Sequence, residues 1–167
     1  MQTSQEDREH LTKLVKEFRT AMLVTCTPTH EMHARPLTLA DTHNEADATI
    51  CFPAGADSGN VAAVRAMAHV NVTMQDGNKF VSLTGMARVS QDRALIDRLW
   101  SDAWKVWFPD GKSDPNIAII VIAPHSAEYW DNSGAKGIRY MFSAAKAALS
   151  GERPTPADND QHAKVRL

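Results

Sequence analysis

Cysteine is scarce in this sequence. Only Cys26 and Cys51 occur among the 167 residues, and each falls within a segment with the residue alternation of a β-strand. Two cysteines can build neither a disulfide framework nor a four-cysteine zinc site, and such scarcity is typical of proteins from a reducing compartment. We therefore expect a cytoplasmic protein whose two cysteines serve as small core residues.

Long apolar runs and an excess of positive charge are also missing. The longest apolar run, residues 117–123, is too short to cross a bilayer, and the polar, acidic start is unlike a signal peptide. The formal net charge of −2 gives no electrostatic reason to expect a nucleic acid or an anionic lipid surface as a partner. The composition, with 43% hydrophobic and 23% charged residues, is that of an ordinary globular domain.

The common catalytic signatures do not occur either. The sequence contains no G-x-G-x-x-G, no P-loop lysine and no serine in a nucleophile elbow. The histidines of "HEMH" at residues 30–33 are one residue too close for the zinc-protease motif and flank a predicted turn, so we expect no metal site. The sequence does not identify a catalytic residue, because no acid–base pair stands out.

What the chain does contain is a series of short strands with few helices between them. Alternation and β-forming residues predict strands over residues 20–26, 33–41, 48–52, 69–74 and 79–89. A continuous apolar run predicts a fully buried strand over residues 117–123, and residues 126–131 are expected to form an edge strand. Helical spacing predicts helices over residues 11–18, where Thr3 and Glu6 form a candidate capping box, and over 61–68, 96–107 and 138–151. This order favours an α+β, mainly β fold, an antiparallel barrel flanked by helices, over a doubly wound sheet.

One domain accounts for nearly all of the chain. Residues 1–150 are expected to form it, with a helix near each end and the last helix stopped at Gly151. Residues 151–167 are expected to form a polar, proline-containing linker followed by a short extended segment, in which Val165 and Leu167 pack.

Three of the four tryptophans, Trp100, Trp104 and Trp107, fall within the predicted helix at residues 96–107. One helical face cannot bury all three equally, so the alternatives are core packing, a partner subunit or a planar ligand. The tryptophan-rich segment at residues 100–108 has more apolar surface than a monomer of this size readily buries. It therefore predicts a homodimer, for which two-fold pairing is the commonest arrangement.

The segment "CFPAGADSGNVAAV" at residues 51–64 predicts a strand, a loop of small residues and a helix. Exposed backbone amides at the start of a helix favour anions, and Ser58 lies at that start. However, no lysine or arginine lies within the segment, whereas phosphate sites usually include one. The segment therefore reads either as a weakened phosphate cradle or as an ordinary strand–loop–helix turn.

Seven stretches occur in one order along the chain: "RPLTL", "VSLTGMARV", "LWSDAWKVWFPDG", "SDPN", "AEYWD", "AAKAALSGERP" and "HAKVRL". Together they resemble the general stress protein family within the pyridoxamine-phosphate-oxidase-like flavoproteins. The resemblance covers nearly the whole chain, and "KVWFPDG" followed by "AEYWD" is its most specific part. It implies an FMN-binding split β-barrel that forms a homodimer, with two flavin sites at the subunit interface.

The resemblance also implies positions for the flavin. The isoalloxazine ring and ribityl chain would be lined by Arg35, Pro36, Leu37 and Thr38. The family's phosphate-binding positions, usually threonine or serine, then serine, then lysine, fall here at Ala54, Ser58 and Asn60. Phe80 would face the flavin of the neighbouring subunit, and Trp130 would be an interface aromatic.

The implied function is that of a flavin-dependent oxidoreductase of unidentified substrate, with FMN as the cofactor and FAD as its alternative. Replacement of two phosphate-binding side chains, at Ala54 and Asn60, keeps a second hypothesis open: a stress protein without turnover that binds flavin weakly or keeps only the fold. Arg35 is the candidate for supplying the missing charge. Pyridoxamine-phosphate oxidase activity itself is not expected, because that oxidase ends in a substrate-binding segment with a terminal proline and this chain ends in "AKVRL".

Overall fold

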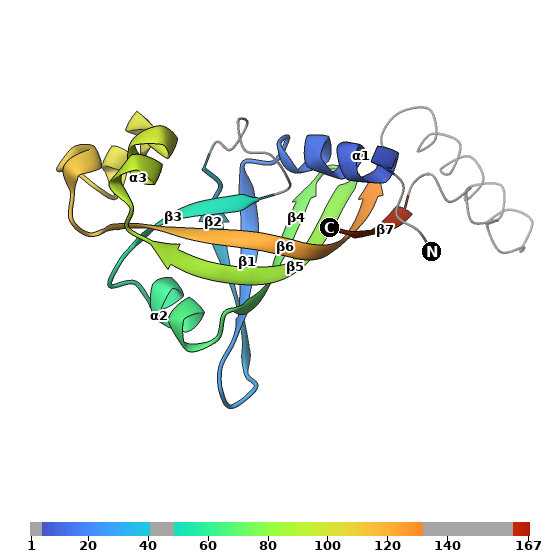
Figure 1. The fold of residues 1–167 in the computed structure, drawn as a ribbon, viewed down its shortest axis with the longest axis horizontal. Coiled ribbons are helices and arrows are strands. Elements are labelled where there is room, and N and C mark those ends of the chain that lie inside the picture. The colour runs from blue at the N-terminus through green and yellow to red at the C-terminus, as the bar shows by residue number, and fades with distance from the viewer. Residues whose placement is uncertain (1–4, 41–48, 132–161) are drawn as a thin grey trace, which may run out of the picture.

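A computed structural model describes residues 5–40, 49–131 and 162–167 of the chain. In this part of the chain, seven antiparallel strands form one open, strongly curved sheet in the order β2-β1-β4-β5-β6-β3, with β7 also paired to β6 (Figure 1). The strands are β1 Thr20–Cys26, β2 Met32–Thr38, β3 Ile50–Gly55, β4 His69–Asp76, β5 Lys79–Ser90, β6 Ile117–Asp131 and β7 His162–Arg166. The predicted α+β, mainly antiparallel split barrel is confirmed.

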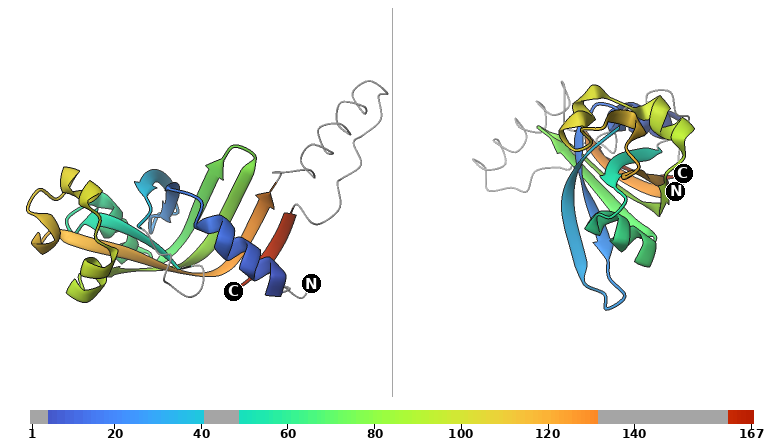
Figure 2. Two further views of the ribbon diagram at one scale, coloured as in Figure 1. Left: turned by 90° about the horizontal axis from the view of Figure 1, so that it is seen from above. Right: turned by 90° about the vertical axis from the view of Figure 1, so that its left-hand side faces the viewer.

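The helices cover different ends of this sheet. Helix α1 (Gln5–Val15) lies across the end where β6 meets β7, whereas α3 (Arg93–Leu99) and the short 3-10 helices η1 (Asp102–Val106) and η2 (Gly111–Ser113) lie at the opposite end (Figure 2). Helix α2 (Gly59–Ala66) follows β3. No helix of the described residues is long and apolar enough to cross a membrane.

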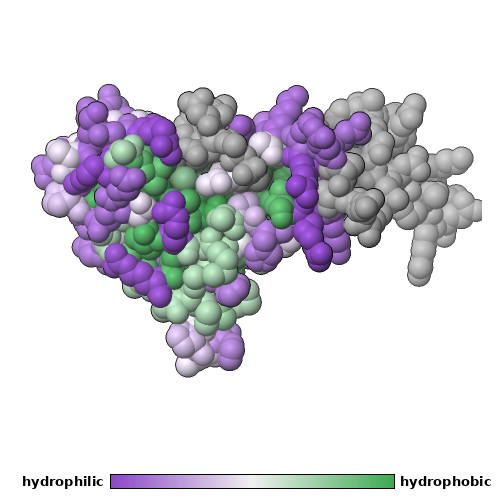
Figure 3. Space-filling model, viewed as in Figure 1, coloured by the Kyte–Doolittle hydropathy of each residue, from purple (hydrophilic) through white to green (hydrophobic). Residues whose placement is uncertain are grey.

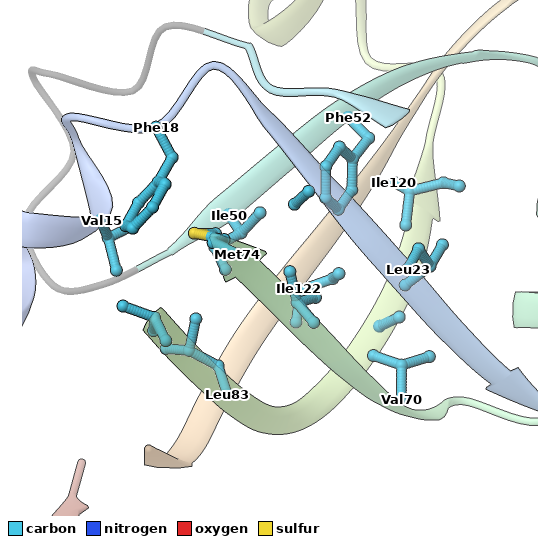
Figure 4. Close-up of a cluster of buried hydrophobic side chains, with 14 of the residues drawn as sticks. Val15, Phe18, Leu23, Ile50, Phe52, Val70, Met74, Leu83, Ile120 and Ile122 are labelled. Atoms are coloured by element: carbon cyan, nitrogen blue, oxygen red, sulfur yellow. The ribbon is translucent and has the colours of Figure 1, made fainter. Parts of the chain in front are cut away.

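The main core fills the concave side of the sheet. Alternation along β1 shows how the sequence directs this packing, because Ala21 and Leu23 are buried while Met22 between them is exposed. Side chains from β1, β3, β4, β5 and β6 converge with Val15 and Phe18 (Figure 4). Burial of these apolar surfaces is the main force that holds α1 and the sheet together.

Strand β6 corrects the prediction of two separate strands at residues 117–123 and 126–131. It runs without interruption from Ile117 to Asp131 and pairs with β5 along this length, with a register shift beside Gly85. A Cβ on Gly85 would lie 2.5 Å from the carbonyl oxygen of Ala123, so only glycine allows this close approach. The second half of β6 is not an edge, because β7 pairs with it.

A second apolar cluster lies on the other side of β3 and β6, and it corrects the prediction of one helix over residues 96–107. Helix α3 ends at Leu99, and Ser101 begins η1 by accepting a hydrogen bond from the N–H of Ala103. The break lets Trp104 and Phe108 pack into this cluster, whereas Trp107 stays 57% exposed.

The remaining predictions for local structure have mixed outcomes. Strand β7 confirms the extended C-terminal segment, with Val165 buried in the main core. Helix α2 ends at Ala66, two residues before the predicted end, because the chain turns extended at Met67. The predicted helix at 138–151, the linker at 152–161 and Thr3 of the capping box lie outside the described residues.

Candidate functional site

A pocket of about 310 Å³ opens between β2, β3, the start of α2 and the segment that follows η1. This volume is at the lower end of the range, about 300–1,000 Å³, that ligand pockets usually have. The pocket is lined by Pro36, Leu37, Thr38, Pro53, Ala54, Gly55, Ser58, Asn60, Trp107, Phe108 and Asn116.

The strand–loop–helix segment forms one wall. Strand β3 ends at Gly55, and the N–H of Ser58 donates to the carbonyl of Gly55 (2.9 Å), which closes a tight turn. Ser58 then caps α2, since its Oγ accepts from the N–H of Val61 (3.3 Å); such caps contribute about 1 kcal/mol to stability. Val61 and Val64 bury the far face of α2 in the main core, which holds the beginning of the helix at the pocket.

An aromatic wall comes from the segment after η1. Phe108 is buried in the second apolar cluster, and its neighbour Trp107 lines the pocket while remaining largely exposed. The bend after them is fixed by Arg93, whose guanidinium donates to the carbonyls of Lys112, Ser113 and Asp114 at 3.1–3.2 Å. This network also sets the position of Asn116, whose carbonyl accepts from the N–H of Ala56 (2.7 Å).

The third wall is the end of strand β2, which lies at the edge of the described sheet and pairs there with β1. Pro36, Leu37 and Thr38 reach the pocket from there. Arg35 precedes them but does not line the pocket. Its Nη1 donates to Thr25 Oγ1 (3.4 Å), and Thr25 pairs in register with His33, toward the other end of β2.

The lining of the pocket is polar without being charged. The lining residues with hydrogen-bonding side chains are Thr38, Ser58, Asn60, Trp107 and Asn116, and the described residues bring no ionisable side chain to the pocket. The Oδ1 atom of Asn60 is buried and has no hydrogen-bond partner, an arrangement that costs free energy unless a ligand or water donates to it. The pocket is therefore suited to a planar, largely apolar molecule that carries hydrogen-bonding groups.

A nearby charge modifies this picture. Asp57 is exposed in the loop before α2, and a Cβ on the pocket residue Gly55 would lie 3.0 Å from its Oδ1 and 3.2 Å from Asn116 Nδ2. The carboxylate thus lies beside Gly55, a residue of the pocket lining, without lining the pocket itself.

Asp102, in η1, is a second carboxylate near the aromatic wall. Lys105 and Trp100 donate hydrogen bonds to it, and the bond from Lys105, followed by that from Trp100, lowers the pKa of this carboxyl.

Six of the nine residues expected at the flavin meet in this pocket: Pro36, Leu37, Thr38, Ala54, Ser58 and Asn60. Arg35, Phe80 and Trp130 do not. Phe80 pairs with Trp130 in the register of β5 and β6, and Trp130 lies twelve residues along β6 from Ala118, the partner of Ala54. Twelve residues span about 40 Å of strand, so one subunit cannot bring these two aromatics to its own pocket.

Five pocket residues were missed: Pro53, Gly55, Trp107, Phe108 and Asn116. The tryptophan-rich segment and the loop "FPDGKSDPN" carried a signal for the last three, since a planar ligand was one interpretation of the tryptophans. The sequence did not place these residues at the pocket, because the spacing of apolar residues predicted one continuous helix over residues 96–107. Among the described residues, no cluster of three or more histidine, cysteine, aspartate or glutamate side chains could hold a metal ion.

Comparison with known proteins gives consistent matches. The family model described as "Pyridoxamine 5'-phosphate oxidase like" matches residues 6–155. General stress protein 26 of Bacillus subtilis is 37% identical over 60 residues, which are 36% of this chain and 41% of that protein. The chain thus aligns with about two fifths of the length of this relative.

Solved structures share the fold. A general stress protein 26 of Jannaschia sp. CCS1 is 24% identical, with a TM-score of 0.72 over 98% of this chain and 100% of that chain. The general stress FMN/FAD binding protein of Xanthomonas citri is 28% identical, with a TM-score of 0.67 over 79% of this chain and 93% of that chain. An FMN binding protein of Nostoc punctiforme PCC 73102 is 12% identical, with a TM-score of 0.63 over 98% of this chain and 95% of that chain.

Proposed function

The chain belongs to the pyridoxamine 5'-phosphate oxidase like family, and from this membership we propose that it is a flavin-binding protein of the general stress type. The observation that carries the proposal is the pocket, because it collects six residues from three separate elements at which the family resemblance implies flavin contacts. The description of the Xanthomonas citri relative as FMN/FAD binding supports the same reading.

The residues fit the ring and the ribityl chain of a flavin. Trp107 and Pro36 offer flat apolar surface to the isoalloxazine ring, and the hydroxyl of Thr38 and the amide of Asn116 offer neutral hydrogen bonds. The phosphate of FMN fits less well, because the positions that usually bind it hold Ala54 and Asn60. When bound, a flavin supplies redox chemistry, while the protein supplies position and electrostatics.

The proposed activity is that of a flavin-dependent oxidoreductase. The described pocket lining offers no side chain for general acid–base work, so its residues would bind the flavin, orient it and exclude water from one side. The same observation supports the alternative of a flavin carrier without turnover. Bleaching of the bound flavin by NADH or NADPH distinguishes an enzyme from a carrier.

A homodimer is the proposed assembly. Phe80 and Trp130 could reach a flavin only from a second copy, given their distance along the sheet from the pocket. Met22, Met32 and Pro36 are exposed on one face of the β1–β2 hairpin, with Met32 at 70% exposure, and Figure 3 shows an apolar surface above the polar hairpin tip. An apolar strand surface of this kind is typical of protein interfaces. Light scattering that gives a monomer at micromolar concentration would contradict the assembly.

Titration of FMN and riboflavin with the purified chain tests the binding proposal. Trp107 at the pocket is expected to quench flavin fluorescence on contact, and saturation at one flavin per chain is the expected result. A Trp107→Ala variant should quench less at saturation, while Trp104→Phe, a change inside the second apolar cluster, should leave the quench unchanged. If neither FMN nor riboflavin shows saturable quenching of its fluorescence, flavin binding is refuted.

A further inference from the structure

We propose that this pocket binds riboflavin, the unphosphorylated flavin, at least as tightly as FMN. The inference rests on the proposed flavin binding and concerns the end of the ligand that reaches α2. It follows from three properties of that end of the pocket: the charges around it, the start of α2 and the unpartnered Oδ1 of Asn60.

The charges around the pocket do not favour a phosphate. A phosphate monoester is close to a dianion at neutral pH, and proteins usually bind it with arginine or lysine. Here the described lining carries no charged side chain, and the carboxylate that borders Gly55 belongs to Asp57. This negative charge would repel a phosphate at the pocket mouth, whereas it leaves a neutral hydroxyl unaffected.

Arg35 does not compensate for the missing cation. Although it adjoins Pro36 in sequence, its guanidinium donates to Thr25 Oγ1, and Thr25 is 2% exposed. Thr25 lies opposite His33, toward the end of β2 that is remote from Thr38. Moving the guanidinium to the pocket would leave the buried hydroxyl of Thr25 without this donor.

The start of α2 only weakly offsets the repulsion between Asp57 and a phosphate. The N–H groups of Gly59 and Asn60 have no acceptor within the helix, and a helix N-terminus carries a partial charge of about +0.5. Helix α2 has only eight residues, and its cap Ser58 already accepts from Val61. The full negative charge of Asp57, one residue before the cap, is larger and of opposite sign.

Asn60 adds a positive reason for a hydroxyl. Asn60 is one of the lining residues, and its Oδ1 is buried without a donor. The terminal 5′-hydroxyl of riboflavin can donate a hydrogen bond to this oxygen, whereas the phosphate that replaces this hydroxyl in FMN presents only acceptors. Lone pairs of the dianion and of Oδ1 would repel each other. With the terminal position of the ribityl chain at Asn60, riboflavin satisfies this buried acceptor, whereas the phosphate of FMN does not.

The test is a fluorescence titration of the full-length, flavin-free chain with riboflavin, FMN and lumiflavin, which shares the ring system but lacks the ribityl chain. The expected result is a riboflavin Kd equal to or below that of FMN. FMN binding that is tenfold or more tighter would overturn the inference while the proposed function stands. If none of the three flavins binds, the proposed function fails and this inference fails with it.

Two variants test the physical causes separately. Asn60→Leu keeps the side-chain size but removes the acceptor, so the riboflavin Kd should rise about five- to tenfold while the lumiflavin Kd stays constant. Asp57→Asn removes the negative charge, so the FMN Kd should fall severalfold while the riboflavin Kd stays constant. Both variants should keep the melting temperature of the parent chain within a few degrees. Equal changes for all ligands in either variant would contradict the assigned role of that residue.

Discussion

Replacing Asn60 with lysine is expected to turn the pocket into an FMN site. The side chain at position 60 lines the pocket beside the start of α2, so an ammonium group there would meet the phosphate of FMN. Hydrogen bonds to charged groups contribute roughly 1.5–3 kcal/mol, and about 1.4 kcal/mol corresponds to a tenfold change in affinity. FMN should therefore bind about ten- to a hundredfold more tightly to Asn60→Lys than to the parent chain.

Three features of the site lower the expected gain in FMN affinity toward tenfold. The lysine can pair with Asp57 when no ligand is bound, and Asn60 is only partly buried, so water screens the new charge. The longer stem must also fit in a pocket of about 310 Å³. Asn60→Met, which adds a stem of similar length without the charge, is the matched control and should not improve FMN binding.

Fluorescence titration of FMN and riboflavin against the parent chain, Asn60→Lys and Asn60→Met measures this effect. The riboflavin Kd should barely change, because riboflavin has no phosphate. An equal gain for riboflavin would indicate general stabilisation rather than phosphate binding. No gain for either ligand would mean that position 60 does not face the ligand end, which would refute the assignment of the phosphate position.

Other parts of the molecule carry their own predictions. Arg93→Ala should raise the Kd of any bound flavin severalfold, because the bend that holds Trp107 and Asn116 loses four hydrogen bonds; an unchanged Kd would show that the bend is rigid without them. Gly85→Ala should cost at least about 2–3 kcal/mol of unfolding free energy in urea denaturation, since the new Cβ meets the backbone of β6. Deletion of residues 163–167 should lower the melting temperature by several degrees, because it removes β7 and the buried Val165. The ionised Asp102 should make the parent chain more stable than Asp102→Asn, and this advantage should be fully present above about pH 4, the usual range of an aspartate carboxyl. The advantage should disappear as the pH falls through the lowered pKa of Asp102. A difference that grows on acidification would contradict the sign.

The sheet was largely predictable because its strands alternate cleanly. Strand β1 has the predicted bounds, since buried Ala21 and Leu23 alternate with more exposed neighbours. Strand β6 was divided in the prediction because Pro124 interrupts its apolar run. A proline is tolerated there because, on the side of β6 away from β5, pairing with β3 ends at Ile122 and pairing with β7 begins at Ser126, so Pro124 lies in a gap of the ladder. This gap depends on other strands and is invisible in the local pattern.

The pocket was predictable only in part. The family resemblance identified six pocket residues on β2, β3 and the start of α2, because these residues lie within or beside the motifs that carry the resemblance. The aromatic wall was not predicted, because the apolar spacing of residues 96–107 concealed the break at Trp100 and the cap at Ser101. The roles of Arg35, Phe80 and Trp130 at the flavin stay predictions, and the last two depend on a second copy of the chain.

The most direct test of the central claim is a crystal structure of the protein grown with riboflavin. The account predicts a flavin whose ring contacts Trp107 and the end of β2, with a ribityl hydroxyl within hydrogen-bond distance of Asn60 Oδ1. A flavin bound elsewhere, or a ribityl chain directed away from α2, would contradict it.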